Sequence, residues 1–163
     1  MLGPAWVAPA IAADKASRAS VPSVEEPAGL SHADGNRPDG LSLIARQGCL
    51  TWDVTVANTL AATYLASVST TAGSVAEGAA SRKDKKYSAI AQPHVFVPLA
   101  IETLGPINFK GLKFLSESGD HLTAATDDPR EASFLFQQIS ILIQRFNAVC
   151  FQGTLTQLEG VEY

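Results

Sequence analysis

Apolar and polar residues alternate with a period of two in two neighbouring stretches of the chain, residues 40–46 and 49–56. This alternation predicts two β-strands, and the Gln47-Gly48 connection between them predicts a hairpin turn. One face of the second strand carries the apolar side chains of Leu50, Trp52, Val54 and Val56. Asp53 lies on the opposite face, because successive side chains of a strand point to opposite sides. An ionisable residue in the middle of a strand is unusual and marks this position for attention.

Two other segments are expected to be extended. Residues 21–26 form a short strand or extended piece before a loop rich in Gly, Asp, Asn and Pro at residues 27–38. Residues 94–102 are almost continuously apolar, which predicts a strand that is buried on both faces of the sheet. Pro98 inside this strand has no N–H to donate, and it therefore favours an edge position or a bulge.

Helical patterns account for most of the remaining chain. The predicted helices cover residues 5–18, residues 73–90, residues 110–118 and a longer segment that begins at residues 127–129. Gly119 is expected to end the third of these helices. The buried stripe of the last helix is predicted to consist of Phe134, Ile141, Leu142, Phe146 and Val149. Residues 58–71 are ambiguous between a loop and a short helix.

The order of these elements predicts an α/β fold with a small mixed sheet flanked by helices. The hairpin supplies antiparallel strands, and a helical crossover returns the chain to the strand at residues 94–102. We interpret residues 1–20 as an N-terminal helix, residues 21–105 as the core, and residues 106–163 as a C-terminal helical part of the same domain.

Composition excludes several classes of protein. Of the 163 residues, 46% are hydrophobic and 17% are charged, which excludes wholesale disorder. The two cysteines, Cys49 and Cys150, are too few for a disulfide framework and have no Cys or His neighbour at zinc-ligand spacing. The formal net charge of −4 argues against a general nucleic-acid binder, so any nucleic-acid site must be local. No apolar run reaches the roughly 18 residues of a membrane span, and a soluble protein is expected.

Three acidic residues are expected to lie near one another in the core. Glu26 ends the first extended piece, Asp39 precedes the hairpin, and Asp53 lies inside its second strand. Thirteen residues separate Asp39 from Asp53, enough for a strand, a tight turn and a returning strand, so the two carboxylates can meet across the ladder. Such carboxylates repel each other unless a cation lies between them, and Mg²⁺ or Mn²⁺ suits oxygen ligands. Glu102, the last residue of the strand predicted over residues 94–102, either adds to this cluster or caps the end of that strand.

Positive charge is concentrated in the second half of the helix predicted over residues 73–90. The segment from Arg82 to Lys86 contains four cations and one anion. Lys83 and Lys86 lie one turn apart on one helical face, and Tyr87 follows Lys83 at i+4. A divalent ion polarises a phosphodiester and activates the attacking water, and a nearby cation stabilises the phosphate. The acids and the basic helix together therefore indicate a metal-dependent nuclease.

The same residues resemble a known family. The similar segments are Arg37-Pro38-Asp39, Trp52-Asp53-Val54-Thr55, Arg82 to Tyr87, and residues 96–105. They look like the restriction-like endonuclease domain at the C-terminus of site-specific non-LTR retrotransposon polyproteins, a branch of the PD-(D/E)xK nucleases. The resemblance extends over about residues 21–105, and the helix at residues 134–151 is similar to the segment after such domains in related elements. It implies a restriction-endonuclease-like core, DNA as the substrate, and a reverse transcriptase as a module outside this chain.

The resemblance also implies roles for individual residues. Asp39 and Asp53 would be metal ligands for Mg²⁺ or Mn²⁺, and Glu26 is similar to an acidic position ahead of the motif. The catalytic lysine would be Lys83 or Lys86, and the resemblance leaves this choice open. Tyr87 would be an active-site or positioning residue.

One departure from the parent pattern keeps an alternative open. The parent nucleases have their lysine two residues after the second acid, where this chain has Thr55. In the retrotransposon branch the lysine comes from the following helix, as Lys83 or Lys86 would. The alternative is a catalytically inactive remnant or interaction module that retains the nuclease fold. A homodimer through the Ala-rich N-terminus and the apolar C-terminal helix is a further interpretation. The expected location is intracellular, and nuclear if the protein is eukaryotic and active.

Overall fold

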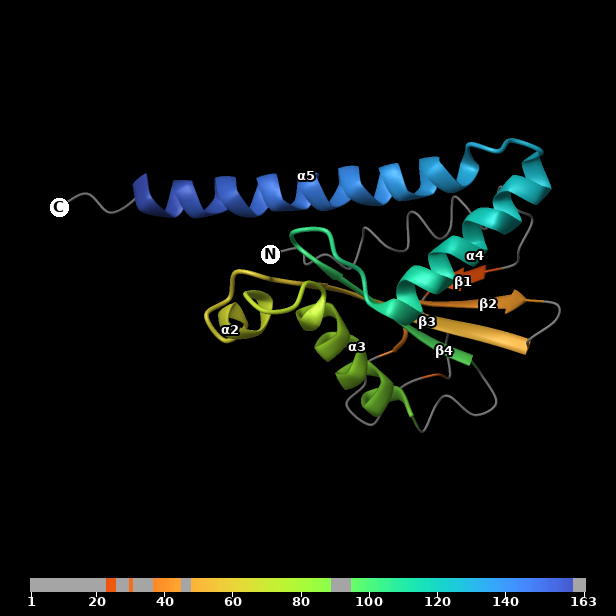
Figure 1. The fold of residues 1–163 in the computed structure, drawn as a ribbon, viewed down its shortest axis with the longest axis horizontal. Helices are drawn as coiled ribbons and strands as arrows, with labels where there is room; N and C mark the ends of the chain where they lie inside the picture. Colours follow the sequence, from red (N-terminus) through yellow and green to blue (C-terminus); the bar gives the residue numbers. More distant parts are fainter. Residues whose placement is uncertain (1–22, 26–29, 31–36, 45–47, 89–94, 160–163) are drawn as a thin grey trace.

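A computed structural model of the chain describes residues 23–25, 30, 37–44, 48–88 and 95–159. Figure 1 shows the order of the elements along the chain. The strands are β1 (Ser23–Glu25), β2 (Gly40–Ile44), β3 (Gly48–Ala57) and β4 (Val95–Glu102). The helices are α2 (Leu65–Val68), α3 (Ser74–Tyr87), α4 (Phe109–Thr126) and α5 (Glu131–Glu159). The helix predicted over residues 5–18 lies outside the described residues.

The four strands form one mixed sheet in the order β1-β2-β3-β4. β1 and β2 are antiparallel, as are β2 and β3, whereas β3 and β4 are parallel and are joined through α2 and α3. Gly40 lies opposite Trp52 in the hairpin, and Asp53 lies beside Pro98 of β4. The antiparallel pairing of the predicted hairpin, the helical crossover and the mixed α/β class are therefore confirmed. The predicted turn position of Gly48 is wrong, because Gly48 pairs with Ile44 as the first residue of β3, and residues 45–47 lie outside the described residues. β4 is an edge strand, as Pro98 indicated.

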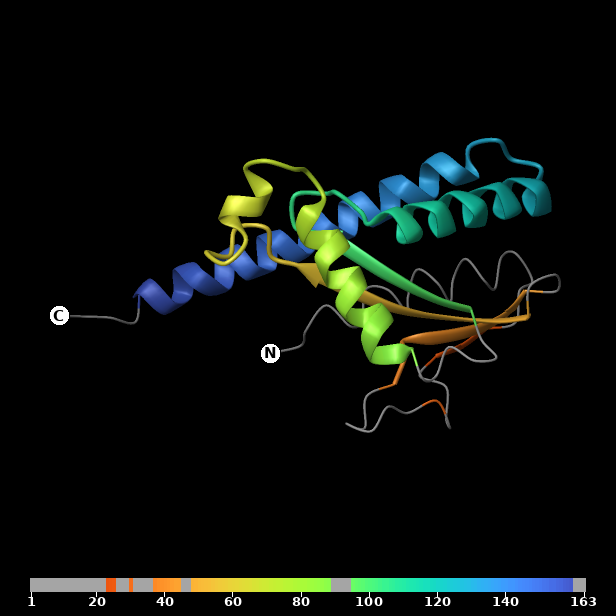
Figure 2. The same ribbon diagram turned by 60° about the horizontal axis from the view of Figure 1, so that its bottom comes forward.

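α3 packs against one face of the sheet (Figure 2). The odd-numbered residues of β3 and the even-numbered residues of β4 point toward this helix, because side chains alternate along each strand. Small side chains dominate the contact, which brings the helix backbone close to the sheet. The buried members of this cluster are Ala57, Val75, Ala76, Ala79, Ala80 and Ala100.

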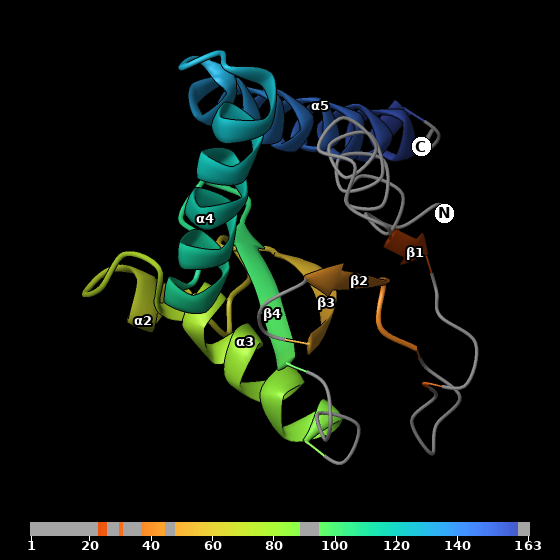
Figure 3. The same ribbon diagram turned by 90° about the vertical axis from the view of Figure 1, so that its right-hand side faces the viewer.

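α4 and α5 cover the opposite face, as seen in Figure 3. Trp52 of β3 stacks on Phe114 of α4 with ring centroids 6.3 Å apart. Large aliphatic side chains fill the rest of this cluster, which contains Leu99, Ile101, Leu115, Leu135, Ile139 and Ile143. Both faces of β3 are therefore covered, and Asp53 points into protein rather than into solvent.

The structure corrects the predicted end of the third helix. Gly119 does not terminate it, because α4 continues to Thr126 and ends at Asp127 in the left-handed conformation. Gly119 instead lies where α4 crosses α5. A Cβ atom added there would lie 2.9 Å from the Cβ of Ala132, so the glycine allows the close approach of the two helices.

The prediction of which apolar residues of the last helix are buried is also wrong. Ile141 and Val149 are 57% and 66% exposed, while the buried apolar residues among the described side chains of α5 are Leu135, Ile139 and Ile143. The helix is apolar on more than one side, and its contact with α4 and β4 decides which side is buried. The C-terminal end of α5 projects beyond the rest of the described chain (Figure 1). None of the helices in the described residues combines the length and apolar character that a membrane span requires.

Candidate active site

Asp53 lies in the middle of β3 on the face that α3 covers. The residue is 4% exposed. Oδ2 lies 2.5 Å from Nζ of Lys83, and this contact is an ion pair without the geometry of a hydrogen bond. Burial of a carboxylate is costly unless a countercharge accompanies it. Asp53 is therefore not on a solvated sheet face, and Lys83 supplies the charge that its burial requires.

α3 brings two side chains to Asp53. Lys83 and Tyr87 are four residues apart, and this spacing sets both on the buried face of the helix. The Tyr87 hydroxyl lies 3.3 Å from Oδ1 of Asp53 and 3.2 Å from the backbone carbonyl of Arg37, so one proton is shared between two acceptors. The Tyr87 ring is 1% exposed and packs on Phe96 of β4 with centroids 4.9 Å apart. Tyr87 therefore links three separate parts of the chain at this point.

Asp39 reaches the same place from the start of β2. Gly40 pairs with Trp52, so Asp39 lies just before the strand that runs beside Asp53. Oδ2 of Asp39 accepts a hydrogen bond of 2.6 Å from the backbone N–H of Val54. A Cβ atom at Gly40 would overlap the indole of Trp52, so only glycine lets the chain pass this ring. The Asp39 carboxylate thus binds the backbone of β3 at the residue that follows Asp53.

The two candidate lysines have different surroundings. Lys83 lies at the Asp53 carboxylate, and its side chain is 27% exposed. Lys86 lies over the Tyr87 ring, with Nζ 5.4 Å from the centroid, a cation–π contact. Lys83 is also 5.9 Å from this centroid. Of the two lysines, Lys83 is therefore the one whose amine contacts the buried carboxylate.

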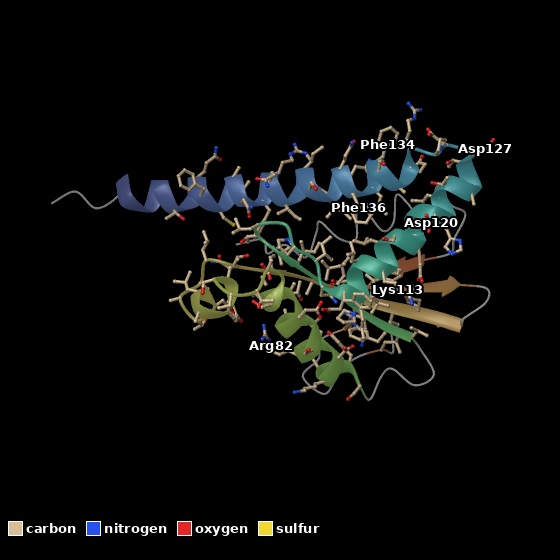
Figure 4. All side chains as sticks on the ribbon, in the orientation of Figure 1. Arg82, Lys113, Asp120, Asp127, Phe134 and Phe136 are labelled. Atoms are coloured by element: carbon tan, nitrogen blue, oxygen red, sulfur yellow. The ribbon has the colours of Figure 1, made fainter. Side chains whose placement is uncertain are left out.

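The basic residues around this site face outward. Arg82 and Lys85 are exposed, and Arg82 donates a hydrogen bond of 3.2 Å to the Tyr64 hydroxyl. Asp84, the single acid of the run, is paired with Lys110 of α4 at 2.6 Å. Figure 4 shows Arg82 on α3 and Lys113 on α4, which are on separate helices. The exposed end of α3 therefore carries a local positive charge on an acidic protein.

Buried Glu102 anchors the other end of α3. Its Oε1 accepts hydrogen bonds from the backbone N–H groups of Val75 and Ala76, at 3.0 and 3.1 Å. Gly73, the N-cap residue, has no side chain to do this. A carboxylate at a helix N-terminus also interacts favourably with the helix dipole. The sequence left two roles open for Glu102. The structure supports the capping role, and the element that Glu102 caps is the N-terminus of α3 rather than the end of its own strand.

Asp39 and Asp53 fit a divalent ion better than they fit a structural zinc site. No three His, Cys, Asp or Glu side chains gather as a metal-binding group within the part of the chain that the structure describes, and Glu26 lies outside that part. Mg²⁺ typically uses one or two protein carboxylates and completes its shell with water and substrate phosphate. Oδ2 of Asp53 is buried and accepts no hydrogen bond from the described residues, and the cation beside it is the Lys83 ammonium.

Some features of the site have no clear signal in the sequence. The Arg37 carbonyl contacts Tyr87 through its backbone, which no side-chain pattern reveals. The role of Glu102 depends on β4 and α3 being neighbours, which requires the parallel pairing of β3 and β4. Thr55 points toward α3, as its position two residues after Asp53 requires.

Comparison with known proteins adds no family assignment. No protein-family model matches the chain, and a search of the curated proteins found no match.

Proposed function

We propose that this protein is a metal-dependent DNA endonuclease module that hydrolyses a phosphodiester bond. The observation that carries the proposal is the contact of the buried Asp53 carboxylate with the Lys83 amine from the following helix, with Asp39 bound to the backbone N–H of the next residue, Val54. Two carboxylates and one amine match the needs of phosphodiester hydrolysis. The mixed sheet is compatible with a restriction-endonuclease-like core, and the sequence resemblance supports a retrotransposon origin with a reverse transcriptase as partner module.

Each of the chain's own residues would have a distinct role in the reaction. Asp39 and Asp53 would hold Mg²⁺ or Mn²⁺, which when bound polarises the phosphodiester and activates water. Lys83 would stabilise the negative charge that develops on the scissile phosphate. Tyr87 would act as a positioning residue, since its hydroxyl joins Asp53 to the backbone just before Asp39. Arg82 and Lys85 would contact the DNA backbone beside the site.

The proposal is tested by cleavage of nicked, branched and duplex DNA in the presence of Mg²⁺ or Mn²⁺. We expect the wild-type chain to cleave at least one of these substrates and Asp53→Asn to lose about 100-fold or more of the rate, as removal of an electrostatic group in an active site does. Asp120→Asn is the matched control, because Asp120 is an exposed acid on α4. Equal cleavage by wild type and Asp53→Asn would overturn the assignment.

A second candidate function is a non-catalytic interaction module that retains the fold. The observation that favours it is the buried ion pair itself, since Asp53 and Lys83 neutralise each other without any ligand. This candidate predicts no cleavage by the wild-type protein and no effect of Mg²⁺ or Mn²⁺ on its thermal unfolding. Metal-dependent stabilisation that disappears in Asp39→Asn would count against it.

A further inference from the structure

We propose that the Lys83 ammonium and the divalent ion use the same oxygen of Asp53, so that binding the ion releases Lys83 from the carboxylate. This inference rests on the proposed function and specifies how its site is controlled. It makes Lys83 an internal countercharge while the ion is absent and a group free to reach phosphate once the ion is bound.

The two oxygens of Asp53 are not equivalent. Oδ1 is within hydrogen-bonding distance of the Tyr87 hydroxyl, at 3.3 Å. Oδ2 is buried, accepts no hydrogen bond from the described residues, and has the Lys83 amine at 2.5 Å. A buried carboxylate oxygen normally accepts at least one hydrogen bond. Oδ2 is therefore the oxygen that a cation would take, and the cation already beside it is Lys83.

The ion and the amine would compete because both are cations. Mg²⁺ binds a carboxylate oxygen at about 2.0–2.1 Å, which leaves no room for an ammonium group at its present distance without strong repulsion between like charges. Asp53 is 4% exposed, so the protein screens this repulsion much less than water would. One of the two cations has to leave.

Lys83 is the partner that can move. Asp53 is fixed by backbone pairing of β3 with β2 on one side and β4 on the other. The Lys83 side chain is 27% exposed, and its four-carbon stem allows the amine to turn toward solvent without a change in the helix. The carboxylate therefore stays in position while the lysine swings outward.

The exchange changes the charge that an approaching phosphate meets. Two carboxylates and one ammonium leave one net negative charge in the resting site, whereas the same groups with a divalent ion carry one net positive charge. A phosphodiester is therefore attracted more strongly in the second case. DNA binding at the site is thus expected to follow metal binding.

The test measures the affinity of Mn²⁺ for the full chain by titration calorimetry and by electron paramagnetic resonance. We expect Lys83→Met to bind Mn²⁺ about tenfold or more tightly than the wild type, because no amine has to be displaced. Lys85→Met is the matched control, since Lys85 is exposed on the same helix, and it should bind like the wild type. Asp53→Asn should lose binding.

A second measurement uses the wild-type protein, in case Lys83→Met does not fold. Adding Mg²⁺ should shift the side-chain ammonium signal of Lys83 in NMR spectra toward that of a solvated lysine, while the Lys85 signal stays unchanged. Two outcomes would overturn the exchange and leave the nuclease proposal standing, provided that the wild type cleaves DNA. One is an equal Mn²⁺ affinity of the wild type and Lys83→Met, and the other is a Lys83 signal that does not shift when Mg²⁺ is added. Absence of both Mn²⁺ binding and cleavage in the wild type would overturn both.

Discussion

At the scale of single residues, the site depends on contacts that reach across the chain rather than along it. Asp53 from β3 meets Lys83 and Tyr87 from α3, and the Tyr87 hydroxyl also reaches the Arg37 carbonyl. The Asp53 carboxylate is shielded from water, so its partners contribute more than surface ion pairs do. Loss of one partner of Asp53 should therefore lower the free energy of unfolding as well as the activity.

Tyr87→Phe tests whether the loss of one partner of Asp53, the Tyr87 hydroxyl, lowers the stability of the fold. The ring and its packing on Phe96 remain, but the two acceptors lose a shared donor in a buried place. We expect the free energy of unfolding, measured in urea, to fall by about 1–3 kcal/mol. Tyr64→Phe removes a hydroxyl that forms an exposed hydrogen bond with Arg82, and it should cost less than about 0.5 kcal/mol. Equal losses in the two variants would contradict the role given to Tyr87.

At the scale of elements, α3 is held at both ends by carboxylates of the sheet. Glu102 of β4 accepts hydrogen bonds from the first turn of α3, and Asp53 of β3 pairs with Lys83 near its last turn. Alanines along the helix let it lie close to the sheet between these two anchors. On the other face, α4 and α5 approach each other at Gly119 and Ala132.

Alanine substitutions at two helical glycines separate packing from helix propensity. Gly119→Ala would press its Cβ against Ala132, at 2.9 Å from the Cβ and 3.0 Å from the Cα. We expect this overpacking to outweigh the gain in propensity and to lower the free energy of unfolding by about 1–2 kcal/mol.

Gly78→Ala in α3 is the control for this comparison. Its added Cβ would meet only the end of the Arg82 side chain, at 3.6 Å, which is an ordinary contact. We expect the substitution to raise the free energy of unfolding by about 0.5–1 kcal/mol through helix propensity alone. Effects of the same sign in both variants would contradict the close helix contact at Gly119.

At the scale of the whole molecule, charge is distributed unevenly. The chain has a formal net charge of −4, yet Arg82 and Lys85 are exposed on the helix that also supplies Lys83. Binding of DNA would therefore be local and strongly dependent on salt, because few phosphates can be neutralised. The rest of the surface would repel the polyanion and help to orient it toward α3.

This orientation can be checked by the salt dependence of DNA binding, measured by fluorescence anisotropy. Replacing Arg82 and Lys85 together by Gln should reduce the slope of log K against log salt concentration by about 2, since each cation accounts for about one phosphate. Lys113→Gln is the control, because Lys113 is exposed on α4 on the other side of the sheet. An unchanged slope in the double variant, or an equal change for Lys113→Gln, would show that DNA binds elsewhere.

The sequence by itself determined the strands of the hairpin, the face of β3 on which Asp53 lies, and the helix that carries Lys83 and Tyr87. These features follow from local periodicities, since side chains alternate along a strand and recur every three to four residues along a helix. The expected meeting of Asp39 and Asp53 rests on the same periodicity combined with a short turn, and it stays a prediction.

Only the tertiary structure decided which side of each apolar element is buried and which amine meets which acid. Ile141 and Ile143 are equally apolar, and the contact of α5 with α4 and β4 buries one and exposes the other. Lys83 and Lys86 are one turn apart on α3. Among the contacts of the described residues, the packing of α3 on the sheet brings only the Lys83 amine into an ion pair with Asp53. Such choices depend on packing between segments distant in the chain, which no local pattern encodes.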